Sequence, residues 1–276
     1  MARTPKLTLI YSCCLFLAAC GSESPDRATA DAVAQPEVAA QPEAGRPSFI
    51  EAALADPRRS ADDIARDVNR KPEHVLQFIG IEPGMAVLDM YSGGGYYTEL
   101  LSYVVGSDGR VVAHNNTPYA KIASKDIEAR YSNGRLRNVE QLIGENNRLK
   151  LEADTFDAVL FILAYHDVYY IDGGWGWELV DRPMMLAEIF HAMKPGAALG
   201  LVDHVAAAGM PAELVKPLHR VDPELVKADF LAAGFVLDAE SDVLRNPADD
   251  YNMLAMLPQI RGRSDRVLLR FIKPAD

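Results

Sequence analysis

Short, almost uninterrupted apolar runs alternate with helix-like segments through most of the chain after residue 80. The run FDAVLFILAY at residues 156–165 is apolar almost throughout, as expected of a strand covered on both faces. The next segment, residues 181–196, begins with Asp-Arg-Pro and ends with Lys-Pro-Gly, which are typical start and stop signals of a helix. This alternation predicts a doubly wound α/β sheet with helices on both faces. The expected strands include residues 85–90, 109–115, 156–165, 197–204, 236–244 and 266–274.

A run of glycines follows the first of these strands. The sequence VLDMYSGGGYYTELL, residues 87–101, places Asp89 at the end of an apolar run and then Gly93, Gly94 and Gly95 in succession. Glycine at this point lets the backbone approach a ligand closely, and ligands of such sheets bind at the carboxyl ends of the strands. A dinucleotide site is disfavoured, because Thr98 stands where the last glycine of G-x-G-x-x-G would be and the second strand ends in His-Asn-Asn.

The glycine loop resembles motif I of the class I S-adenosylmethionine-dependent methyltransferases, and the likeness covers nearly all of residues 80–276. AEIFHAMKPGAALGLVDH, residues 187–204, is similar to the fourth helix, turn and fifth strand of that family. YHD at 165–167 and LHRVDP at 218–223 further resemble a bacterial subfamily of predicted methyltransferases. The resemblance implies a single Rossmann-like domain with a seven-stranded, mainly parallel sheet of order 3-2-1-4-5-7-6. It also implies S-adenosylmethionine as cofactor and methyl transfer to a small-molecule acceptor.

The resemblance carries cofactor-binding roles onto matching positions. Gly93 to Gly95 would cradle the methionine portion and the ribose side of the cofactor, and Asp89 would approach the methionine amino group. Asn115 stands where most members have an acid that binds the ribose hydroxyls, and Glu145 would meet the adenine amino group. Two departures weaken the match: Asn115 forgoes a charge-assisted hydrogen bond, and Tyr91 replaces the usual first glycine.

Methyl transfer requires an acceptor atom held in line with the methyl group and, for some acceptors, a base that removes a proton. Tyr165, His166 and Asp167 are expected at the end of the fourth strand and His204 at the end of the fifth, where methyltransferases face the methyl group. These four are the candidate catalytic residues, with His166 or His204 as the base. Each could instead cap a strand or pair with a nearby carboxylate. His219 lies on the same edge of the sheet.

Asp167, Asp203 and His204 also permit a divalent metal, since some O-methyltransferases bind Mg²⁺ at these two strand ends. Carboxylates together with a histidine suit several metals. A clear third carboxylate is missing, so the sequence does not predict a metal site.

Two further segments could reach the substrate. Residues 169–183, YYIDGGWGWELVDRP, predict a lid over an apolar or aromatic small molecule, although Trp175 and Trp177 could instead pack the loop onto the body. Before the first strand, Arg66 and Arg70 recur at helical spacing with acids, which predicts a solvated charged face rather than a substrate contact.

The start of the chain predicts export. Arg3 and Lys6 precede a stretch of apolar residues, 7–19, that is shorter than the ~20 residues of a transmembrane helix and is typical of a secretory signal. LAAC, Leu17–Cys20, resembles the lipobox of bacterial lipoproteins. That resemblance implies cleavage before Cys20 and a lipid on its sulfur, which anchors the protein in the cell envelope facing the periplasm.

Three parts of the chain are therefore expected: a signal peptide at 1–19, a tether at 20–46 and a methyltransferase-like domain at 47–276. The tether is rich in Ala, Pro and Glu and cannot bury enough apolar surface to fold. All three cysteines lie at or before residue 20, so the domain has no disulfide and no cysteine metal ligand. Loss of the two basic residues of the signal takes the formal charge from −11 to −13, which disfavours nucleic acid as a partner.

Export leaves the function open, because S-adenosylmethionine is not made outside the cytoplasm. One interpretation is an envelope methyltransferase. A second is a non-catalytic module that binds a nucleoside-type small ligand, which the departures at Tyr91 and Asn115 would suit. A third is a related transferase such as an aminopropyl transferase, which usually has further acids around its amine pocket. The intact Asp89 and the three glycines favour the methyltransferase.

Overall fold

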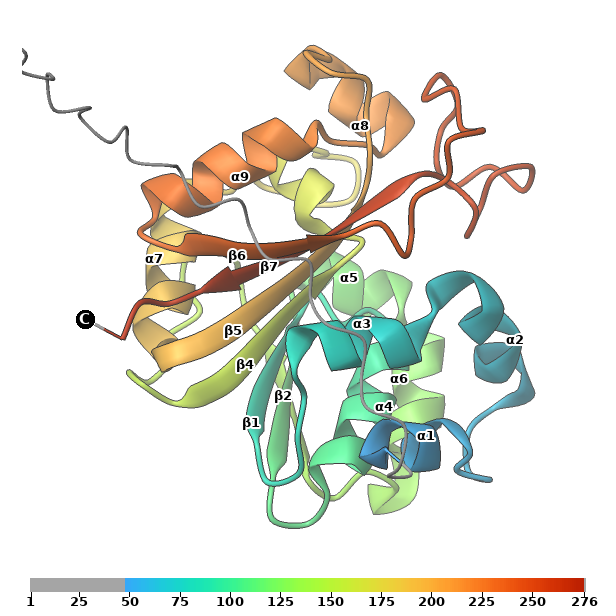
Figure 1. Ribbon diagram of the computed structural model, residues 1–276, viewed down its shortest axis with the longest axis vertical. Helices are drawn as coiled ribbons and strands as arrows, with labels where there is room; N and C mark the ends of the chain where they lie inside the picture. The colour runs from blue at the N-terminus through green and yellow to red at the C-terminus, as the bar shows by residue number, and fades with distance from the viewer. Residues whose placement is uncertain (1–47, 276) are drawn as a thin grey trace, which may run out of the picture. The chain divides into compact units, whose positions relative to one another are not determined.

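The computed structural model describes residues 48–275, so the expectations for the signal peptide, Cys20 and the tether fall outside the described residues. Figure 1 shows how the elements are arranged. The strands are β1 (Ala86–Met90), β2 (Arg110–Asn115), β3 (Val139–Ile143), β4 (Phe156–Ile162), β5 (Met193–His204), β6 (Val236–Ser241) and β7 (Arg266–Ile272). The α-helices are α1 (Phe49–Leu54), α2 (Ala61–Arg70), α3 (Pro72–Ile79), α4 (Tyr96–Val105), α5 (Thr117–Ile122), α6 (Ser124–Tyr131), α7 (Arg182–Ala192), α8 (Val215–Leu218) and α9 (Pro223–Ala232). The 3₁₀ turns are η1 (Ser132–Gly134), η2 (Tyr165–Tyr169) and η3 (Ala212–Leu214).

The strands form one seven-stranded sheet of order β3-β2-β1-β4-β5-β7-β6. Strands β1 to β5 pair in parallel, and β7 runs antiparallel to both β5 and β6. This confirms the predicted α/β fold class and strand order. The carboxyl ends of β1, β2, β4 and β5 share one edge of the sheet, which is where ligands bind in folds of this kind.

The two faces of the sheet follow from the alternation of side chains along each strand. In β1, Leu88 packs into a core with α7 and α9, whereas Val87 packs into a core with α1, α3 and α4. In β4, Val159 and Phe161 face the first core and Ala158 and Leu160 face the second. Both sides of β4 are therefore buried, which explains why its sequence is apolar almost throughout.

Strand β4 is shorter than predicted. It ends at Ile162, and Leu163 adopts a φ of +58° that turns the chain out of the sheet. Tyr165, His166 and Asp167 consequently lie in the turn η2 rather than at the end of the strand itself. A non-glycine residue such as leucine seldom adopts a positive φ, so nothing in the sequence indicates that the strand ends here.

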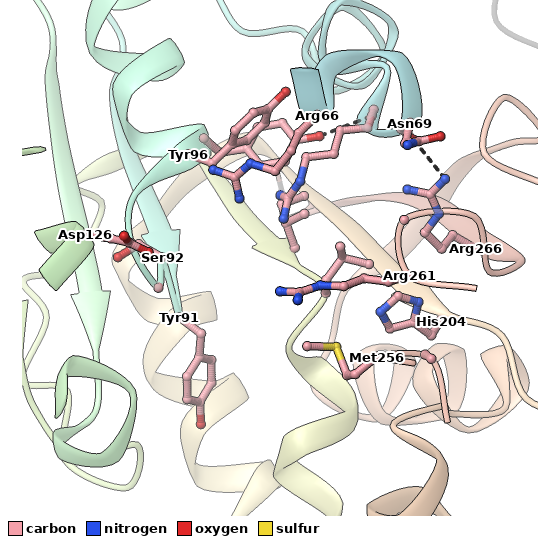
Figure 2. A pocket seen from close by; sticks show the side chains of 18 of the residues that line it. Arg66, Asn69, Tyr91, Ser92, Tyr96, Asp126, His204, Met256, Arg261 and Arg266 are labelled. Atoms are coloured by element: carbon pink, nitrogen blue, oxygen red, sulfur yellow. Dashed lines mark hydrogen bonds between the residues drawn. The ribbon is translucent and has the colours of Figure 1, made fainter. Parts of the chain in front are cut away.

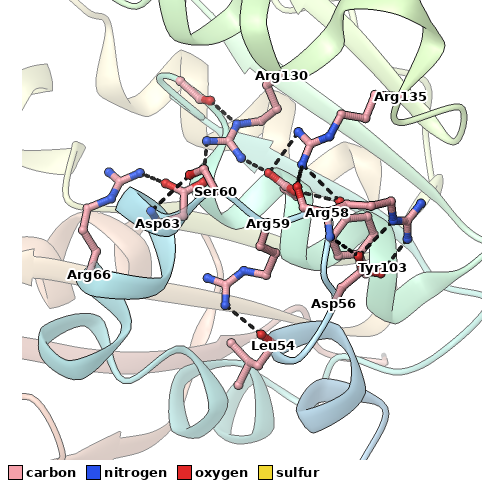
Figure 3. A network of polar contacts seen from close by, with 12 residues as sticks. Leu54, Asp56, Arg58, Arg59, Ser60, Asp63, Arg66, Tyr103, Arg130 and Arg135 are labelled. Carbon is pink, nitrogen blue, oxygen red and sulfur yellow. Dashed lines mark hydrogen bonds and ion pairs between the residues drawn. The ribbon is translucent and has the colours of Figure 1, made fainter.

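Charged contacts attach α2 to the body of the domain (Figure 3). Arg130 of α6 pairs with Asp63 of α2 at 2.8 Å and with Glu99 of α4. Arg59 holds Asp67 through two bonds of 2.7 Å. Asp63 is the buried residue of α2, so this helix is held mainly by ion pairs rather than by apolar packing.

Within residues 48–275, no helix combines the length and the apolar character required to cross a bilayer.

Candidate functional site

A cavity of about 610 Å³ opens at the carboxyl edge of the sheet (Figure 2). Its floor is formed by the end of β1 and the glycine loop, and α2 and α4 form one wall. The segment between β6 and β7 supplies the opposite wall with Met256 and Arg261, and β5 contributes His204. The volume lies within the ~300–1,000 Å³ usual for small-molecule sites.

Asp89 lies buried at the floor of this cavity. Thr98 Oγ1 donates a hydrogen bond of 2.6 Å to its Oδ2. Burial raises the pKa of Asp89 to about 7, although the hydrogen bond from Thr98 and the charge of Arg70 act in the opposite direction. Asp89 is thus a carboxyl group that gains or loses its charge near neutral pH, which is a common property of functional residues.

The three glycines differ in what they face. Gly93 adopts a φ of +56°, and a Cβ there would meet open space, whereas a Cβ on Gly94 would lie 2.5 Å from Cβ of Asp126. A Cβ on Gly95 would lie 2.5 Å from the hydroxyl of Tyr131. Gly93 and Gly94 line the cavity, and the absence of a Cβ at Gly94 and Gly95 allows helix α6 to pack against the loop.

Asn115 binds the glycine loop. Its Oδ1 accepts from the backbone N–H of Gly93 at 2.9 Å, and its Nδ2 donates to Gly93 O and to Ser92 Oγ. Asn115 is buried and does not line the cavity, and Glu145 accepts from Thr117 Oγ1 outside it. Ser92 does line the cavity, and since its oxygen accepts from Asn115, its own O–H remains available to a ligand. Sequence reasoning missed Ser92, because a serine inside a glycine loop has no distinctive spacing.

Tyr91 fills the position of the expected glycine with a φ of +51°. Its ring stacks on Trp177 with centroids 5.8 Å apart and also contacts Tyr119. Trp177 is buried and donates from Nε1 to Asp167 O, whereas Trp175 is 58% exposed. Neither tryptophan lines the cavity, so the lid over the substrate remains a prediction.

The cavity wall is rich in arginine. Arg66 and Arg70 of α2 both line it; Arg66 is exposed, as predicted for a solvated charged face, and Arg70 is partly exposed. Arg66 pairs with Asp63. Among the described residues, no carboxylate forms an ion pair with Arg70, Arg261 or Arg266, which also line the cavity. Burial lowers the pKa of Arg70 and of Arg266.

His204 is the predicted catalytic residue that reaches the cavity (Figure 2). Its Nδ1 lies 2.6 Å from Ser264 Oγ, which orients the ring. Burial, followed by the positive charges of His166, Arg266 and Arg220, holds the pKa of His204 well below its usual value. The imidazole is therefore neutral at physiological pH, and its lowered pKa makes it a weaker base than an ordinary histidine.

The other predicted catalytic residues form a buried cluster beside the cavity and do not line it. His166 Nδ1 lies 2.7 Å from Asp203 Oδ1, and its backbone N–H donates to Asp203 Oδ2. Asp167 accepts from the hydroxyls of Tyr119 and Tyr170. The phenol of Tyr165 donates to Asp229 at 3.0 Å. Their predicted catalytic roles remain predictions.

Comparison with known proteins identifies relatives by sequence. Residues 71–168 match the family of protein-L-isoaspartate(D-aspartate) O-methyltransferases. The chain is 26% identical over 199 residues to a ubiquinone/menaquinone biosynthesis C-methyltransferase of Marinomonas sp. (strain MWYL1). The alignment covers 71% of this chain and 67% of the relative. A relative with the same description from Hydrogenovibrio crunogenus is 28% identical over 131 residues, or 47% of this chain and 46% of the relative.

Solved structures share the fold. An S-adenosylmethionine-dependent methyltransferase from Aquifex aeolicus aligns over 83% of this chain and 98% of its own, with a TM-score of 0.54 and 23% identity. An arsenic(III) S-adenosylmethionine methyltransferase from Chlamydomonas reinhardtii aligns over 83% and 74%, with a TM-score of 0.50 and 18% identity.

Proposed function

We propose that this chain, a class I S-adenosylmethionine-dependent methyltransferase, methylates a small anionic acceptor inside the cavity between Asp89 and His204. The observation that carries the proposal is that one cavity joins the glycine loop, a neutral histidine and three arginines without ion-pair partners. The similarity to methyltransferases in sequence and fold indicates methyl transfer as the reaction. The positive charges around the cavity indicate an anionic acceptor.

The residues at the floor of the cavity fit S-adenosylmethionine, which supplies an activated methyl group on a sulfonium when bound. Asp89 would hold the cationic amino group, and the open space beside Gly93 leaves room for the ligand against the backbone. Ser92 rather than Asn115 would contact the ribose side, since the amide of Asn115 already binds the loop.

The charges around the cavity favour a negatively charged acceptor. S-adenosylmethionine carries two positive groups and one carboxylate, so its carboxylate can neutralise at most one guanidinium. Arg70, Arg261 and Arg266 all lack an ion-pair partner among the described residues, and Arg266 is buried. Within residues 48–275, Arg266 donates only to the carbonyl oxygens of Asn69 and Ser264, so a second anion would offset more of the cost of burying its charge. Tyr96 and Tyr97 line the same cavity and offer aromatic surface for the body of the acceptor.

His204 would remove the proton of the acceptor. Its Nδ1 contact with Ser264 leaves the other ring nitrogen available on the cavity side. A positioned base contributes ~10²–10⁴-fold to a rate, and the lowered pKa of His204 places it toward the lower end of that range. The alternative of a non-catalytic nucleoside-binding module has no support from the comparisons.

Calorimetric titration of S-adenosylmethionine and S-adenosylhomocysteine into the purified protein tests the assignment. Micromolar binding of both is expected in wild type, with a strong loss in Asp89→Asn. A folded wild-type protein without affinity for either would overturn it. Incubation with methyl-labelled cofactor and matched sets of carboxylates, phosphates and neutral analogues then tests the acceptor class, and labelling confined to the neutral set would overturn the anionic acceptor.

We also propose that Cys20 carries a lipid that anchors the protein to the envelope membrane. The support is the resemblance of Leu17–Cys20 to a lipobox. Labelled fatty acid should enter the wild-type protein in bacteria, and Cys20→Ser should abolish the labelling. Labelling of that variant to the wild-type level would contradict the proposal.

A further inference from the structure

Three side chains beside the cavity converge in a way that the methyl-transfer reaction does not require. His166 and Asp167 of the turn η2 meet His219, which follows α8 some fifty residues later in the chain. His166 Nε2 lies 3.2 Å from His219 Nδ1 and 3.3 Å from Asp167 Oδ1, and His219 Nδ1 lies 3.7 Å from that same oxygen. We propose that His166, Asp167 and His219 form a site for a divalent transition metal of the zinc class.

The distances among the three ligand atoms fit a tetrahedral ion. Zinc binds histidine nitrogen and carboxylate oxygen at ~2.0–2.1 Å, so the ligand atoms of a tetrahedral zinc lie roughly 3.3 Å from one another. The observed spacings of 3.2, 3.3 and 3.7 Å bracket this value. Only small movements would bring all three atoms to bonding distance of one ion.

The surroundings fix each ligand. Asp203 holds Nδ1 of His166 at 2.7 Å, so Nε2 is the nitrogen presented to the ion. A carboxylate behind a histidine is the usual outer partner of a metal-bound imidazole, because it fixes the tautomer and raises ligand basicity. Asp167 is held by the hydroxyls of Tyr119 and Tyr170.

His219 is held in a strained conformation. Its φ of +47° lies in the left-handed region, which non-glycine residues seldom adopt. The next residue, Arg220, is fully buried in a double ion pair with Asp249, so the backbone at this point is firmly anchored. Strain held in place by its surroundings is typical of functional positions.

The donor set decides the class of metal. Two imidazoles and one carboxylate suit zinc and similar ions, whereas Mg²⁺ and Ca²⁺ prefer oxygen ligands. The side chain of His219 is 32% exposed while those of His166 and Asp167 are buried, so the ion would arrive from the side of His219. Three protein ligands leave a fourth position for water or another ligand, as in catalytic zinc sites.

This set of ligands differs from Asp167, Asp203 and His204, the combination considered from sequence. Asp203 is hydrogen-bonded to His166, and the ring of His204 is hydrogen-bonded to Ser264.

Cobalt provides the test, since tetrahedral Co²⁺ has visible absorption bands. Purified protein stripped by a chelator should bind one equivalent of Co²⁺ with these bands, and Zn²⁺ should displace it. His219→Asn keeps a residue that tolerates the left-handed backbone, and it should weaken binding by at least the ~100-fold that loss of an outer partner of a metal ligand can cost. His191→Asn, which replaces an exposed histidine at the end of α7, should bind as wild type does.

Two outcomes would overturn the proposal: the absence of visible bands in folded wild type, or bands of equal strength in His219→Asn. A near-ultraviolet thiolate-to-cobalt band would place the ion on Cys13, Cys14 or Cys20 instead and would equally overturn it. None of these outcomes depends on the methyl acceptor, so the metal site can fail while the proposed methyl transfer stands.

Discussion

Thr98 donates a 2.6 Å hydrogen bond to Asp89 at the floor of the cavity, and both side chains are buried. The contact favours the charged carboxylate, but burial outweighs it and raises the pKa of Asp89 from 3.8 to about 7. The protein therefore keeps at this position a group whose ionisation costs stability.

Asp89→Asn should change how stability depends on pH. The folded state holds a proton on Asp89 that the unfolded state releases between pH ~4 and ~7, so wild-type stability declines as pH rises through this window. The full difference corresponds to at most about 4 kcal/mol. The variant lacks this group, so its free energy of unfolding should rise relative to wild type from pH 4 to pH 8. Urea unfolding at a series of pH values measures the difference, and a difference that stays constant would contradict the prediction.

His204→Gln should lower kcat by on the order of 10²-fold for any acceptor that must lose a proton, because its lowered pKa makes His204 a weak base, and the affinity for S-adenosylhomocysteine should change little. Because the pKa of His204 lies well below its usual value, the base remains neutral and its contribution to kcat should not fall between pH 8 and pH 6. Kinetics with the methyl-labelled cofactor supply the measurement. The exposed His191 provides the control, and an equal loss in His191→Gln would argue against a specific role.

Arg261→Gln should reduce kcat/KM for anionic acceptors by roughly 10–100-fold, as expected for the loss of a hydrogen bond to a charged group. Neutral acceptors, if methylated at all, should be affected far less. Arg263→Gln is the matched control, because Arg263 is also exposed, lies two residues away and does not line the cavity. Equal effects of the two substitutions on the same acceptor would count against a contact with Arg261.

Arg220→Met should destabilise the protein by about 3–5 kcal/mol, because Asp249 would be left as an unpaired buried charge. Arg220 also donates to Met253 O, so the cavity wall between β6 and β7 should loosen and the affinity for S-adenosylhomocysteine should fall. The double variant Arg220→Met/Asp249→Leu should recover most of the stability. Urea unfolding of the wild type, the single variant and the double variant measures the free energy of unfolding of each. A single variant as stable as the wild type would refute the prediction.

The sequence predicted the sheet well because each buried strand is apolar and the helices begin at clear capping residues, although α7 ends at Ala192 and the Lys-Pro-Gly expected to end it lies in β5. Asp181 and Asp222 cap α7 and α9, and a proline follows within two residues in both cases. The position of Asp89 and the glycines at the end of β1 followed from the same reasoning.

The composition of the cavity was harder to predict, because it depends on how distant segments meet. Arg266 donates to the backbone of Asn69 across 197 residues, and Arg261 lies in a segment without regular structure. Similarly, Asn115 occupies the expected position in the chain, but its amide faces the glycine loop. Spacing along the chain identifies which edge of the sheet a residue reaches, but it does not say which way the side chain points.

The attachment of helix α2 has a consequence for how ligands enter. Ile64 and Val68 of this helix are 50% and 75% exposed, while its inward contacts are carboxylates paired with Arg130 and Arg59. Moving the helix outward therefore breaks ion pairs, of which the one between Arg130 and Asp63 is buried, and it uncovers little of the hydrophobic core. Opening the domain on this side would therefore cost electrostatic rather than hydrophobic energy and would leave the packing of the sheet unchanged.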